Sequence, residues 1–356
     1  MPTTDLARRA AGQLVMAGLP GPEIDRETRD FLRTYAPGGV ILFRRNAGGP
    51  ARLRRFVAEV KALGSGVPPL VAIDHEGGRV HRLRRPFTHF PPARQIGRRG
   101  TRAARAVGLA MGRELAAVGI DLDFAPVLDV ATNPRNAVIG DRAFSDDPTE
   151  ATRLALAFSE GLLRGGVLPC GKHFPGHGGT VGDSHHVLPR DGRSRRVLER
   201  DAIAPFRTAV AAGMPALMTA HVVYPALDPD RPATLSPVIA TRLLRRRLGF
   251  HGALFSDDLE MQAVAGRRQP ARAAVDALGA GCDMLLVCNA LTVAADVIEH
   301  LADAIARGRV PAARYAEALG RIQMLRRLRR PSRTGGPLVW PTHAALRRRV
   351  SATRAT

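Results

Sequence analysis

Residues 167–186 read VLPCGKHFPGHGGTVGDSHH, and the first five of them carry the pattern that decides the fold. This short apolar run, Val167–Gly171, ends at glycine and polar residues, and an amphipathic stretch precedes it at Thr149–Arg164. A buried strand that alternates with an amphipathic helix is typical of the βα units of a parallel sheet. The stretch therefore predicts one βα unit, and the number of its repeats along the chain decides the architecture.

Further apolar runs share the pattern of Val167–Gly171. They lie at Gln13–Leu19, Gly39–Phe43, Leu70–Ile73, Leu122–Val127, Ala216–Ala220, Ala253–Phe255 and Met284–Cys288. Amphipathic stretches separate most of them, among them Arg52–Leu63, Arg102–Ala117, Val197–Ala212, Pro237–Leu248, Ala271–Ala280 and Val293–Arg307. Eight strand–helix units in about 300 residues fit a (β/α)8 TIM barrel, which ordinarily takes about 250 residues. An open doubly wound sheet is the alternative, but no GxGxxG motif follows the first run, so we predict an α/β chain folded as a TIM barrel.

The chain contains no Ser/Pro-rich linker that would divide it, so we predict a single domain. We assign residues 1–340 to the barrel domain and residues 341–356 to an arginine-rich C-terminal tail. The end of the chain, from Arg326 to Thr356, is rich in arginine, proline and small residues. We therefore expect this end to pack loosely or fray.

The composition is that of a globular protein. The 356 residues are 45% hydrophobic, which is enough to bury a sizeable core. No apolar run reaches the roughly 18 residues that would span a bilayer, and the first residues lack the apolar region of a secretory signal. Three cysteines, Cys170, Cys282 and Cys288, form no CxxC pair and are expected to be buried thiols. These features predict a cytoplasmic protein without membrane insertion.

The net charge is +21, and of the 53 basic residues only Lys61 and Lys172 are lysine. Aromatic residues make up 4% of the chain and the arginines are scattered through the expected helices, which is not the pattern of a nucleic-acid reader. We therefore predict no specific nucleic-acid partner, although the charge alone gives weak attraction to polyanions. In a chain that uses arginine almost everywhere, Lys172 indicates a place where a compact ammonium is required.

If the barrel is correct, the reactive groups lie where the strands end, because the βα loops form the mouth of the barrel. Polar residues follow most of the predicted strands at this rim. They are Asp74, His75, Glu76, Arg79, Asp129, Lys172, His173, His221, Asp257, Asp258 and Asn289. Of these, Glu76 is expected to form an internal ion pair with an arginine, and His221 either lines the pocket or is buried.

Two adjacent aspartates, Asp257 and Asp258, end the strand run Ala-Leu-Phe-Ser. A carboxylate at the end of a strand is held rigidly at the mouth, as a nucleophile that attacks from about 3 to 3.5 Å requires. Aspartate is also favoured as the N-cap of a following helix. The pair therefore allows one catalytic and one capping carboxylate.

The glycine-rich segment after Val167–Gly171 contains four histidines, which raises the question of a metal site. His173 and His177 flank Pro175 and Gly176, so they cannot share one helix face as the histidines of a zinc protease do. We therefore predict no metal at this segment. His177 is expected to have a structural role through hydrogen bonding.

The glycines at positions 176, 178, 179 and 182 predict a mobile loop. Near its far end, Asp183 lies two residues before His185, which puts both side chains on one side of an extended chain. The carboxylate can then hold the imidazole and raise its basicity. The segment therefore predicts a general acid/base carried on a hinged loop.

Five motifs in this order resemble glycoside hydrolase family 3. They are IDHEGGRVHRL at 73–83, FAPVLDV at 124–130, IGDRAF at 139–144, KHFPGHG followed by DSH at 172–185, and FSDDLEM at 255–261. Within this family the chain is most similar to the single-domain β-N-acetylhexosaminidases of bacterial cell-wall recycling. The resemblance covers nearly the whole predicted barrel, from about Gln13 to about Asn289.

The resemblance implies a role for each matching residue. Asp257 corresponds to the catalytic nucleophile, His185 to the general acid/base and Asp183 to the partner that orients it. The residues that match those holding the hydroxyls and the acetamido group of the terminal sugar are Asp74, Arg82, Arg142, Lys172 and His173. Where the family often has a charged residue after GHG, this chain has Gly179, a departure that bears on the loop but touches no catalytic position.

The resemblance also implies a retaining exo-β-N-acetylglucosaminidase that releases terminal β-linked GlcNAc. The expected substrate is a small carbohydrate, such as the muropeptide GlcNAc-1,6-anhydroMurNAc of peptidoglycan recycling, and the expected enzyme is a monomer with no metal and no organic cofactor. Two alternatives stay open. One is a β-N-acetylglucosaminide phosphorylase on the same scaffold, because histidine repels an incoming anion less than a carboxylate does. The other is a catalytically idle barrel that binds sugars or polyanions.

Overall fold

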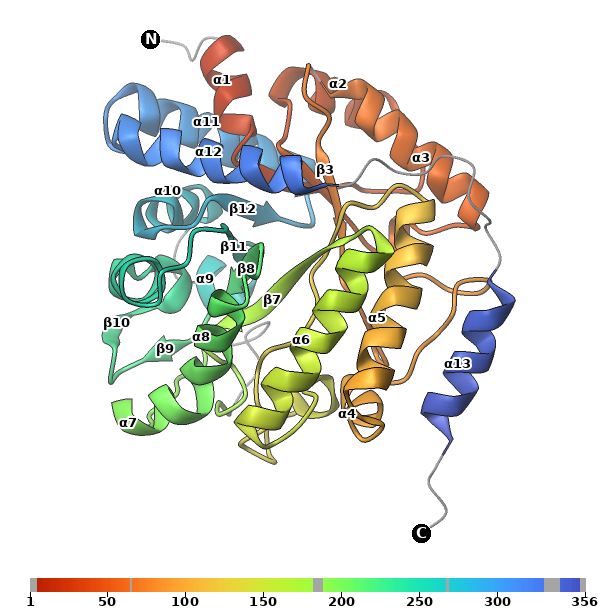
Figure 1. The fold of residues 1–356 in the computed structure, drawn as a ribbon. Coiled ribbons are helices and arrows are strands. Elements are labelled where there is room, and N and C mark those ends of the chain that lie inside the picture. Colours follow the sequence, from red (N-terminus) through yellow and green to blue (C-terminus); the bar gives the residue numbers. More distant parts are fainter. Residues whose placement is uncertain (1–4, 65, 182–187, 267–268, 330–339, 353–356) are drawn as a thin grey trace.

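The computed structural model describes residues 5–64, 66–181, 188–266, 269–329 and 340–352. Within them, parallel strands close into a barrel in the order β1-β12-β11-β8-β7-β6-β3-β2 (Figure 1). The barrel strands are β1 (Val15–Gly18), β2 (Gly39–Leu42), β3 (Leu70–Ile73), β6 (Leu122–Asp123), β7 (Leu168–Phe174), β8 (Ala216–Thr219), β11 (Ala253–Asp258) and β12 (Met284–Val287). Ala17 of β1 pairs with Val287 on one side and Val40 on the other, so the first strand closes the ring. The predicted (β/α)8 TIM barrel is confirmed.

The barrel strands are buried along their length, which explains why they read as unbroken apolar runs. Every residue of β1, β2, β3, β8 and β12 is buried. In a closed parallel barrel the side chains of a strand face either the packed interior or the surrounding helices, so neither set meets water. Burial on both faces therefore replaces the alternation of a half-exposed strand.

Helices surround the barrel (Figure 1). They are α2 (Arg26–Tyr35), α3 (Pro50–Leu63), α5 (Gly100–Ala117), α6 (Pro148–Gly165), α7 (Arg195–Leu198), α8 (Ala204–Ala211), α10 (Pro270–Ala280), α11 (Leu291–Ala306) and α12 (Ala312–Leu328), with π-helical stretches at Glu199–Ile203 and Val238–Arg247. Shorter elements are α1 (Asp5–Gly12), α4 (Ala93–Gly97), α9 (Gln262–Ala265) and the hairpins β4–β5 (His75–Gly77, Val80–His81) and β9–β10 (Val223–Tyr224, Asp228–Pro232). No helix in the described part of the chain is long and apolar enough to cross a membrane.

The C-terminal segment contains a helix, α13 (Pro341–Ser351), that packs beside α5 and α4 (Figure 1). His343 of α13 is buried, and its Nδ1 lies 2.7 Å from Glu114 Oε1 on α5. Just before the helix, the Trp340 ring stacks on Phe87 with 6.0 Å between ring centroids. The expectation of a loosely packed end is therefore wrong for the described part of this segment. The domain division at residue 340 stays a prediction.

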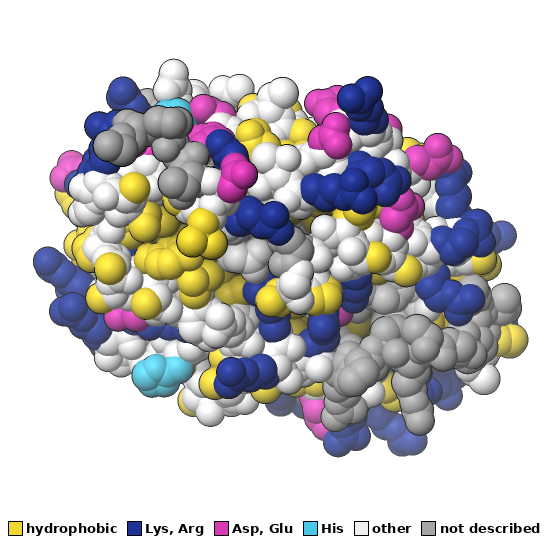
Figure 2. All heavy atoms as spheres, turned by 90° about the horizontal axis from the view of Figure 1, so that it is seen from above, with side chains coloured by type: hydrophobic (Ala, Val, Ile, Leu, Met, Phe, Trp, Pro, Cys, Tyr) yellow, Lys and Arg dark blue, Asp and Glu magenta, His cyan; other side chains and the backbone are white. Residues whose placement is uncertain are grey.

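The face at the top of Figure 1 is turned toward the reader in Figure 2. Basic side chains are scattered over this face among hydrophobic and acidic ones, without a continuous basic stripe. The arrangement is that of a solvated surface, since a nucleic-acid footprint gathers its cations into a patch or stripe.

Candidate active site

Five charged side chains alternate in sign where the barrel strands end. Asp74 directly follows β3, Glu76 lies in β4, Arg82 follows β5, Lys172 lies near the end of β7, and Arg142 ends a 3-10 turn at Gly140–Arg142. Lys172 Nζ donates to Asp74 Oδ1 at 2.6 Å and lies 2.7 Å from Glu76 Oε1. Arg142 donates to both oxygens of Glu76 at 2.8 Å, and Arg82 lies 3.5 Å from Asp74 Oδ2. We call this row, Arg142–Glu76–Lys172–Asp74–Arg82, the charge chain.

Lys172 is the central cation of the charge chain. Its side chain is 2% exposed, and its single nitrogen lies between two carboxylates. A compact ammonium can donate to both carboxylates from one point, whereas a guanidinium is a wide planar fork. These contacts agree with the prediction that position 172 requires an ammonium, which stays a prediction. The expected ion pair of Glu76 with an arginine is confirmed, and its partner is Arg142.

The neighbouring charges keep the members of the charge chain ionised. Burial lowers the pKa of Lys172, but Asp74 and Glu76 outweigh burial and raise that pKa above its ordinary value. Burial raises the pKa of Glu76, but Arg142 and Lys172 outweigh it and hold that pKa below its ordinary value. Both groups are therefore charged at neutral pH, so the cations serve as hydrogen-bond donors without a change of protonation.

Asp129, buried in the loop after β6, holds the histidine that follows Lys172. Its carboxylate accepts the backbone N–H of His173 at 3.2 Å and that of His177 at 2.7 Å, and its Oδ2 lies 2.6 Å from His173 Nδ1. Burial raises the pKa of Asp129, but contact with His173 outweighs burial and lowers that pKa below its ordinary value. The sequence places Asp129 at the rim without giving it a role. Only the fold brings it to His173, because the two residues are 44 positions apart.

The glycine-rich segment begins as a packed turn. A Cβ on Gly178 would lie 1.7 Å from the backbone oxygen of Val130, so glycine is required there for close packing. His177 is buried, and Asn136 Nδ2 donates to its backbone oxygen at 2.8 Å. The structural role expected of His177 is confirmed. Further along, Asn133 Nδ2 donates to the backbone oxygen of Thr180 at 3.1 Å. The mobile loop stays a prediction, and its residues 182–187 lie outside the described residues.

The departure at Gly179 has a structural reason. A Cβ on Gly179 would lie 2.2 Å from the guanidinium carbon of Arg193. The Arg193 guanidinium is itself held by Asp191, whose Oδ2 accepts from Nη2 at 2.6 Å. A side chain at position 179 would therefore require this ion pair to move.

The carboxylate of Asp258, the last residue of β11, accepts hydrogen bonds from backbone N–H groups. Its Oδ1 accepts the N–H of Glu260 at 3.1 Å and that of Cys288 at 3.2 Å. Burial and the nearby carboxylate charges of Glu260 and Asp257 raise the pKa of Asp258 to about 7. Asp258 therefore holds the turn after β11 and the end of β12, and the expected role as N-cap of the next helix is wrong, because the N-cap of α9 is Met261.

Asp257, its neighbour in β11, has a different environment. Its Oδ1 accepts the N–H of Asp258 at 2.9 Å, and the side chain is half-buried at the rim. Burial raises the pKa of Asp257, but the neighbouring His221, His173 and Lys172 and the N–H of Asp258 outweigh burial and lower that pKa below its ordinary value. The carboxylate is therefore ionised at neutral pH, as a nucleophile requires.

Both ring nitrogens of His221 contact protein groups. His221 is buried: its Nδ1 lies 2.8 Å from Thr234 Oγ1 and its Nε2 lies 2.9 Å from the backbone oxygen of Asp258. Of the two alternatives for His221, burial is therefore the one observed. Among the residues described, no group of three or more His, Cys, Asp or Glu side chains is arranged to hold a metal ion.

Most of the predicted site residues meet at this rim. Asp74, Arg82, Arg142 and Lys172 are joined in the charge chain, and Lys172 and His173 lie within electrostatic range of Asp257. Asp183 and His185 lie outside the described residues.

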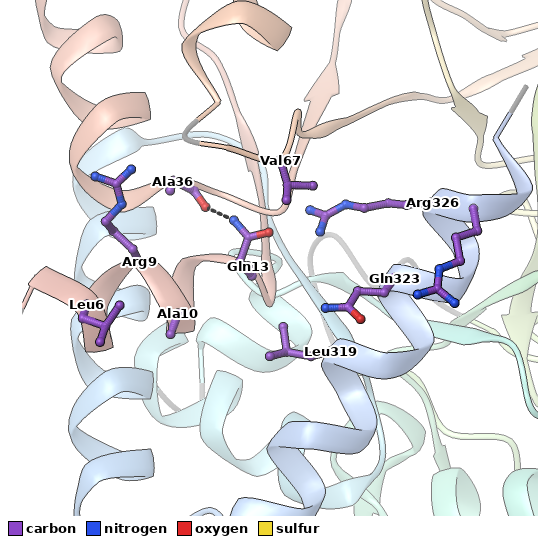
Figure 3. Close-up of a pocket in the computed structure, with 10 residues that line it drawn as sticks. Leu6, Arg9, Ala10, Gln13, Ala36, Val67, Leu319, Gln323 and Arg326 are labelled. Atoms are coloured by element: carbon purple, nitrogen blue, oxygen red, sulfur yellow. Dashed lines mark hydrogen bonds between the residues drawn. The ribbon is translucent and has the colours of Figure 1, made fainter. Parts of the chain in front are cut away.

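A cavity of about 630 Å³ opens at the opposite end of the barrel (Figure 3). It is lined by Leu6, Arg9, Ala10, Gln13, Ala36, Val67, Leu319, Gln323, Arg326 and Arg327. Gln13, Ala36 and Val67 come two to three residues before β1, β2 and β3, so the cavity lies at the amino ends of the strands. None of these described lining residues is a carboxylate or a histidine. The cavity therefore lacks the groups that glycoside cleavage requires.

Comparison with known proteins agrees with the motifs at the rim. The model of the glycosyl hydrolase family 3 N terminal domain matches residues 6–325. A β-hexosaminidase of Methylococcus capsulatus is 45% identical over 290 residues, which cover 80% of this chain and 86% of the relative.

Two solved structures extend this similarity to three dimensions. The glycoside hydrolase family 3 β-N-acetylglucosaminidase from Paenibacillus sp. str. FPU-7 has a TM-score of 0.92 and 37% identity, over 96% of this chain and 68% of that chain. NagZ from Neisseria gonorrhoeae, in complex with N-trifluoroacetyl-D-glucosamine, has a TM-score of 0.74 and 38% identity, over 88% of this chain and 97% of that chain. The motifs, the barrel and the matching family model together establish that this chain belongs to glycoside hydrolase family 3.

Proposed function

We propose that the chain is a retaining exo-β-N-acetylglucosaminidase that releases terminal β-linked GlcNAc. The observation that supports this most is the ionised carboxylate Asp257 at the end of β11, within electrostatic range of Lys172 and His173. The Methylococcus relative is named a β-hexosaminidase, and the NagZ structure holds N-trifluoroacetyl-D-glucosamine. A fixed carboxylate beside sugar-binding charges is the arrangement that the reaction needs.

The reaction proceeds by double displacement. Asp257 attacks the anomeric carbon and forms a glycosyl ester while the bond from that carbon to the leaving oxygen breaks, and His185 gives its proton to this oxygen. In the second step His185 takes a proton from water, the water oxygen bonds to the anomeric carbon, and the ester bond to Asp257 breaks. Two inversions give net retention. Asp183 holds the imidazole of His185 in the orientation that both proton transfers require.

Asp74 and the three cations of the charge chain bind the terminal sugar. Lys172 donates a hydrogen bond to Asp74 Oδ1. The other oxygen, Asp74 Oδ2, lies 3.5 Å from Arg82 and can accept a hydrogen bond from a sugar hydroxyl. Arg82, Arg142 and Lys172 supply donors, since none of them has an acceptor atom. His173 borders the same rim next to Lys172. The sugar is thereby held with its anomeric carbon toward Asp257.

The substrate in the cell is proposed to be the muropeptide GlcNAc-1,6-anhydroMurNAc, in peptidoglycan recycling. Support comes from the resemblance of the motifs to the β-N-acetylhexosaminidases of that process. We propose a cytoplasmic monomer that uses no metal and no organic cofactor, because the two displacement steps need only a carboxylate and an acid/base.

Product analysis with and without inorganic phosphate tests this proposal. We expect an aryl β-N-acetylglucosaminide to give free GlcNAc in both cases, with the β anomer formed first in an NMR time course. GlcNAc 1-phosphate, formed only when phosphate is present, would identify the phosphorylase alternative instead. Saturable sugar binding without turnover would identify the idle barrel.

Lys172→Arg is expected to lower kcat/KM for the aryl substrate by about tenfold or more, which equals about 1.4 kcal/mol of transition-state binding. The guanidinium keeps the charge but cannot place one nitrogen at 2.6 Å from Asp74 and 2.7 Å from Glu76. Lys61→Arg is the matched control, since Lys61 pairs with Asp121 at 2.8 Å and lies outside the charge chain. Equal kcat/KM in the two variants would contradict the assigned role of Lys172.

A further inference from the structure

Glu76 has no role in the reaction as described so far, yet it touches two sugar-binding cations. Its side chain is 5% exposed. Arg142 Nε donates to Oε2 and Arg142 Nη2 donates to Oε1, both at 2.8 Å. Lys172 Nζ lies 2.7 Å from the same Oε1. One buried carboxylate therefore fixes two cations that come from different parts of the barrel rim.

We propose that Glu76 is a positioning residue: it holds the Arg142 guanidinium and the Lys172 ammonium in the arrangement in which both meet the terminal sugar. The inference rests on the proposed function, since it concerns the binding of the same sugar. Glu76 itself does not touch the substrate. Its fork-to-fork contact with Arg142 fixes the plane of the guanidinium, and its contact with Lys172 fixes the position of the ammonium relative to that plane.

An amide cannot replace this carboxylate. Arg142 and Lys172 are both donors only, and Gln at position 76 offers one acceptor oxygen together with an NH2 group, which is also a donor. The NH2 group would face one of the two cations. Arg142 or Lys172 would then have to rotate away, and the sugar would lose a donor that the folded protein had already placed for it.

The opposite reading is that Glu76 only neutralises buried charge. Asp283 provides the comparison, because this buried carboxylate also joins cations: Arg314 Nη2 donates to its Oδ1 at 2.6 Å, and Arg321 lies 3.3 Å away. Asp283 directly precedes β12, so it lies at the amino ends of the strands, away from the rim. A purely structural carboxylate at position 76 would behave in a mutant as Asp283 does.

The charge state of Lys172 separates the two readings. The groups that act on it are Asp74, Glu76, Asp123, Asp257, Cys170 and Arg142. Burial lowers the pKa of Lys172, and Glu76 is one of the two carboxylates that raise it. Without the charge of Glu76, Lys172 loses its proton at a lower pH than in the wild type. Binding of GlcNAc, which needs the ammonium but not the proton of His185, then weakens at a lower pH on the alkaline side.

The test compares Glu76→Gln with the control Asp283→Asn, which makes the same change from carboxylate to amide. Both variants are expected to unfold at a lower temperature than the wild type. Only Glu76→Gln is expected to raise the Kd for GlcNAc, measured by calorimetry, and the KM for an aryl β-N-acetylglucosaminide, each by about tenfold or more. The alkaline pH at which its Kd for GlcNAc begins to rise should also move down by about one pH unit or more.

A folded Glu76→Gln variant with the wild-type Kd for GlcNAc, and with the wild-type dependence of that Kd on alkaline pH, overturns the positioning role alone. A wild-type protein that neither binds GlcNAc nor cleaves the aryl substrate overturns the proposed function, and this inference with it.

Glu76→Asp keeps the inference testable if Glu76→Gln does not fold. It retains the negative charge, so the alkaline pH at which the Kd for GlcNAc begins to rise should stay close to that of the wild type. Its side chain is one methylene shorter and cannot reach Arg142 and Lys172 together, so the Kd for GlcNAc should rise. An unchanged Kd in Glu76→Asp overturns the positioning role.

Discussion

Asp257→Ala is expected to lower kcat for an aryl β-N-acetylglucosaminide by about 10⁴-fold or more, because the variant has no group that can form the glycosyl ester. The loss should be the same for good and poor leaving groups, since both need the nucleophile. Azide should restore part of the turnover by entering the space left by the carboxylate, and the product should then be the α-glycosyl azide. Rates and product configuration can be followed by absorbance and NMR.

Asp258→Asn is the matched control for this prediction. Asp258 is adjacent in β11, but its carboxylate accepts backbone N–H groups at 3.1 and 3.2 Å. Its pKa is raised to about 7 by burial and the neighbouring carboxylates, so the neutral side chain is already populated at neutral pH. The amide resembles that neutral form, and kcat should stay within about tenfold of the wild type. The assignment of roles within the pair is wrong if Asp258→Asn loses more activity than Asp257→Ala.

His185→Ala is expected to have an effect that depends on the leaving group. For a disaccharide substrate, whose leaving oxygen needs a proton, kcat should fall by about 10²- to 10⁴-fold, the usual contribution of a general acid. For a dinitrophenyl glycoside, whose leaving group departs without a proton, glycosyl-enzyme formation should be nearly as fast as in the wild type. The second step then limits turnover, because no base activates water. A burst of dinitrophenol in stopped-flow kinetics would report this change.

The neighbouring His186 provides the control for His185. His186→Ala should leave both substrates within about twofold of the wild type, since only His185 has the spacing from Asp183 that orients an imidazole. Equal losses in the rate of glycosyl-enzyme formation from the disaccharide and from the dinitrophenyl glycoside would show that His185 does not act as the proton donor.

The barrel could be predicted because its strands are apolar on both faces and each one leads toward a helix. The prediction was least exact where polar residues are buried. β7 runs to Phe174, three residues beyond the expected end at Gly171, since Lys172 and His173 are polar. The structure buries them by pairing Lys172 with Asp74 and His173 with Asp129, contacts that span 98 and 44 positions of sequence. Local sequence contains no sign of such partners.

The packing of α13 was not predicted either, because it also depends on a contact between residues that are distant in sequence. Its composition, with Arg347, Arg348 and Arg349 in a row, is typical of a solvated segment. The helix is attached by contacts with residues far away in sequence, among them the buried polar contact between His343 and Glu114, which are 229 positions apart. Composition alone therefore describes the exposed face of this helix but not its attachment.

The residues of the candidate site were predicted more completely than the residues that hold them in place. Asp257, Asp74, Arg82, Arg142, Lys172 and His173 all follow strand ends or belong to motifs, so the sequence pointed to each of them. The support of His173 by Asp129 and the double contact of Glu76 depend on how neighbouring strands are placed around the barrel. These supports are properties of the fold, and only coordinates show them.

The central claim, that Asp257 forms a covalent bond to the anomeric carbon, is tested most directly by trapping the glycosyl-enzyme. A ring-fluorinated N-acetylglucosaminyl fluoride slows both steps while its fluoride leaves readily, so the ester accumulates. Peptide mass spectrometry should then find the added fluorosugar on the peptide that contains Asp257, and fragmentation should locate it on that residue. A label on Asp258 or on any other residue, or turnover without a trapped ester, would contradict the account.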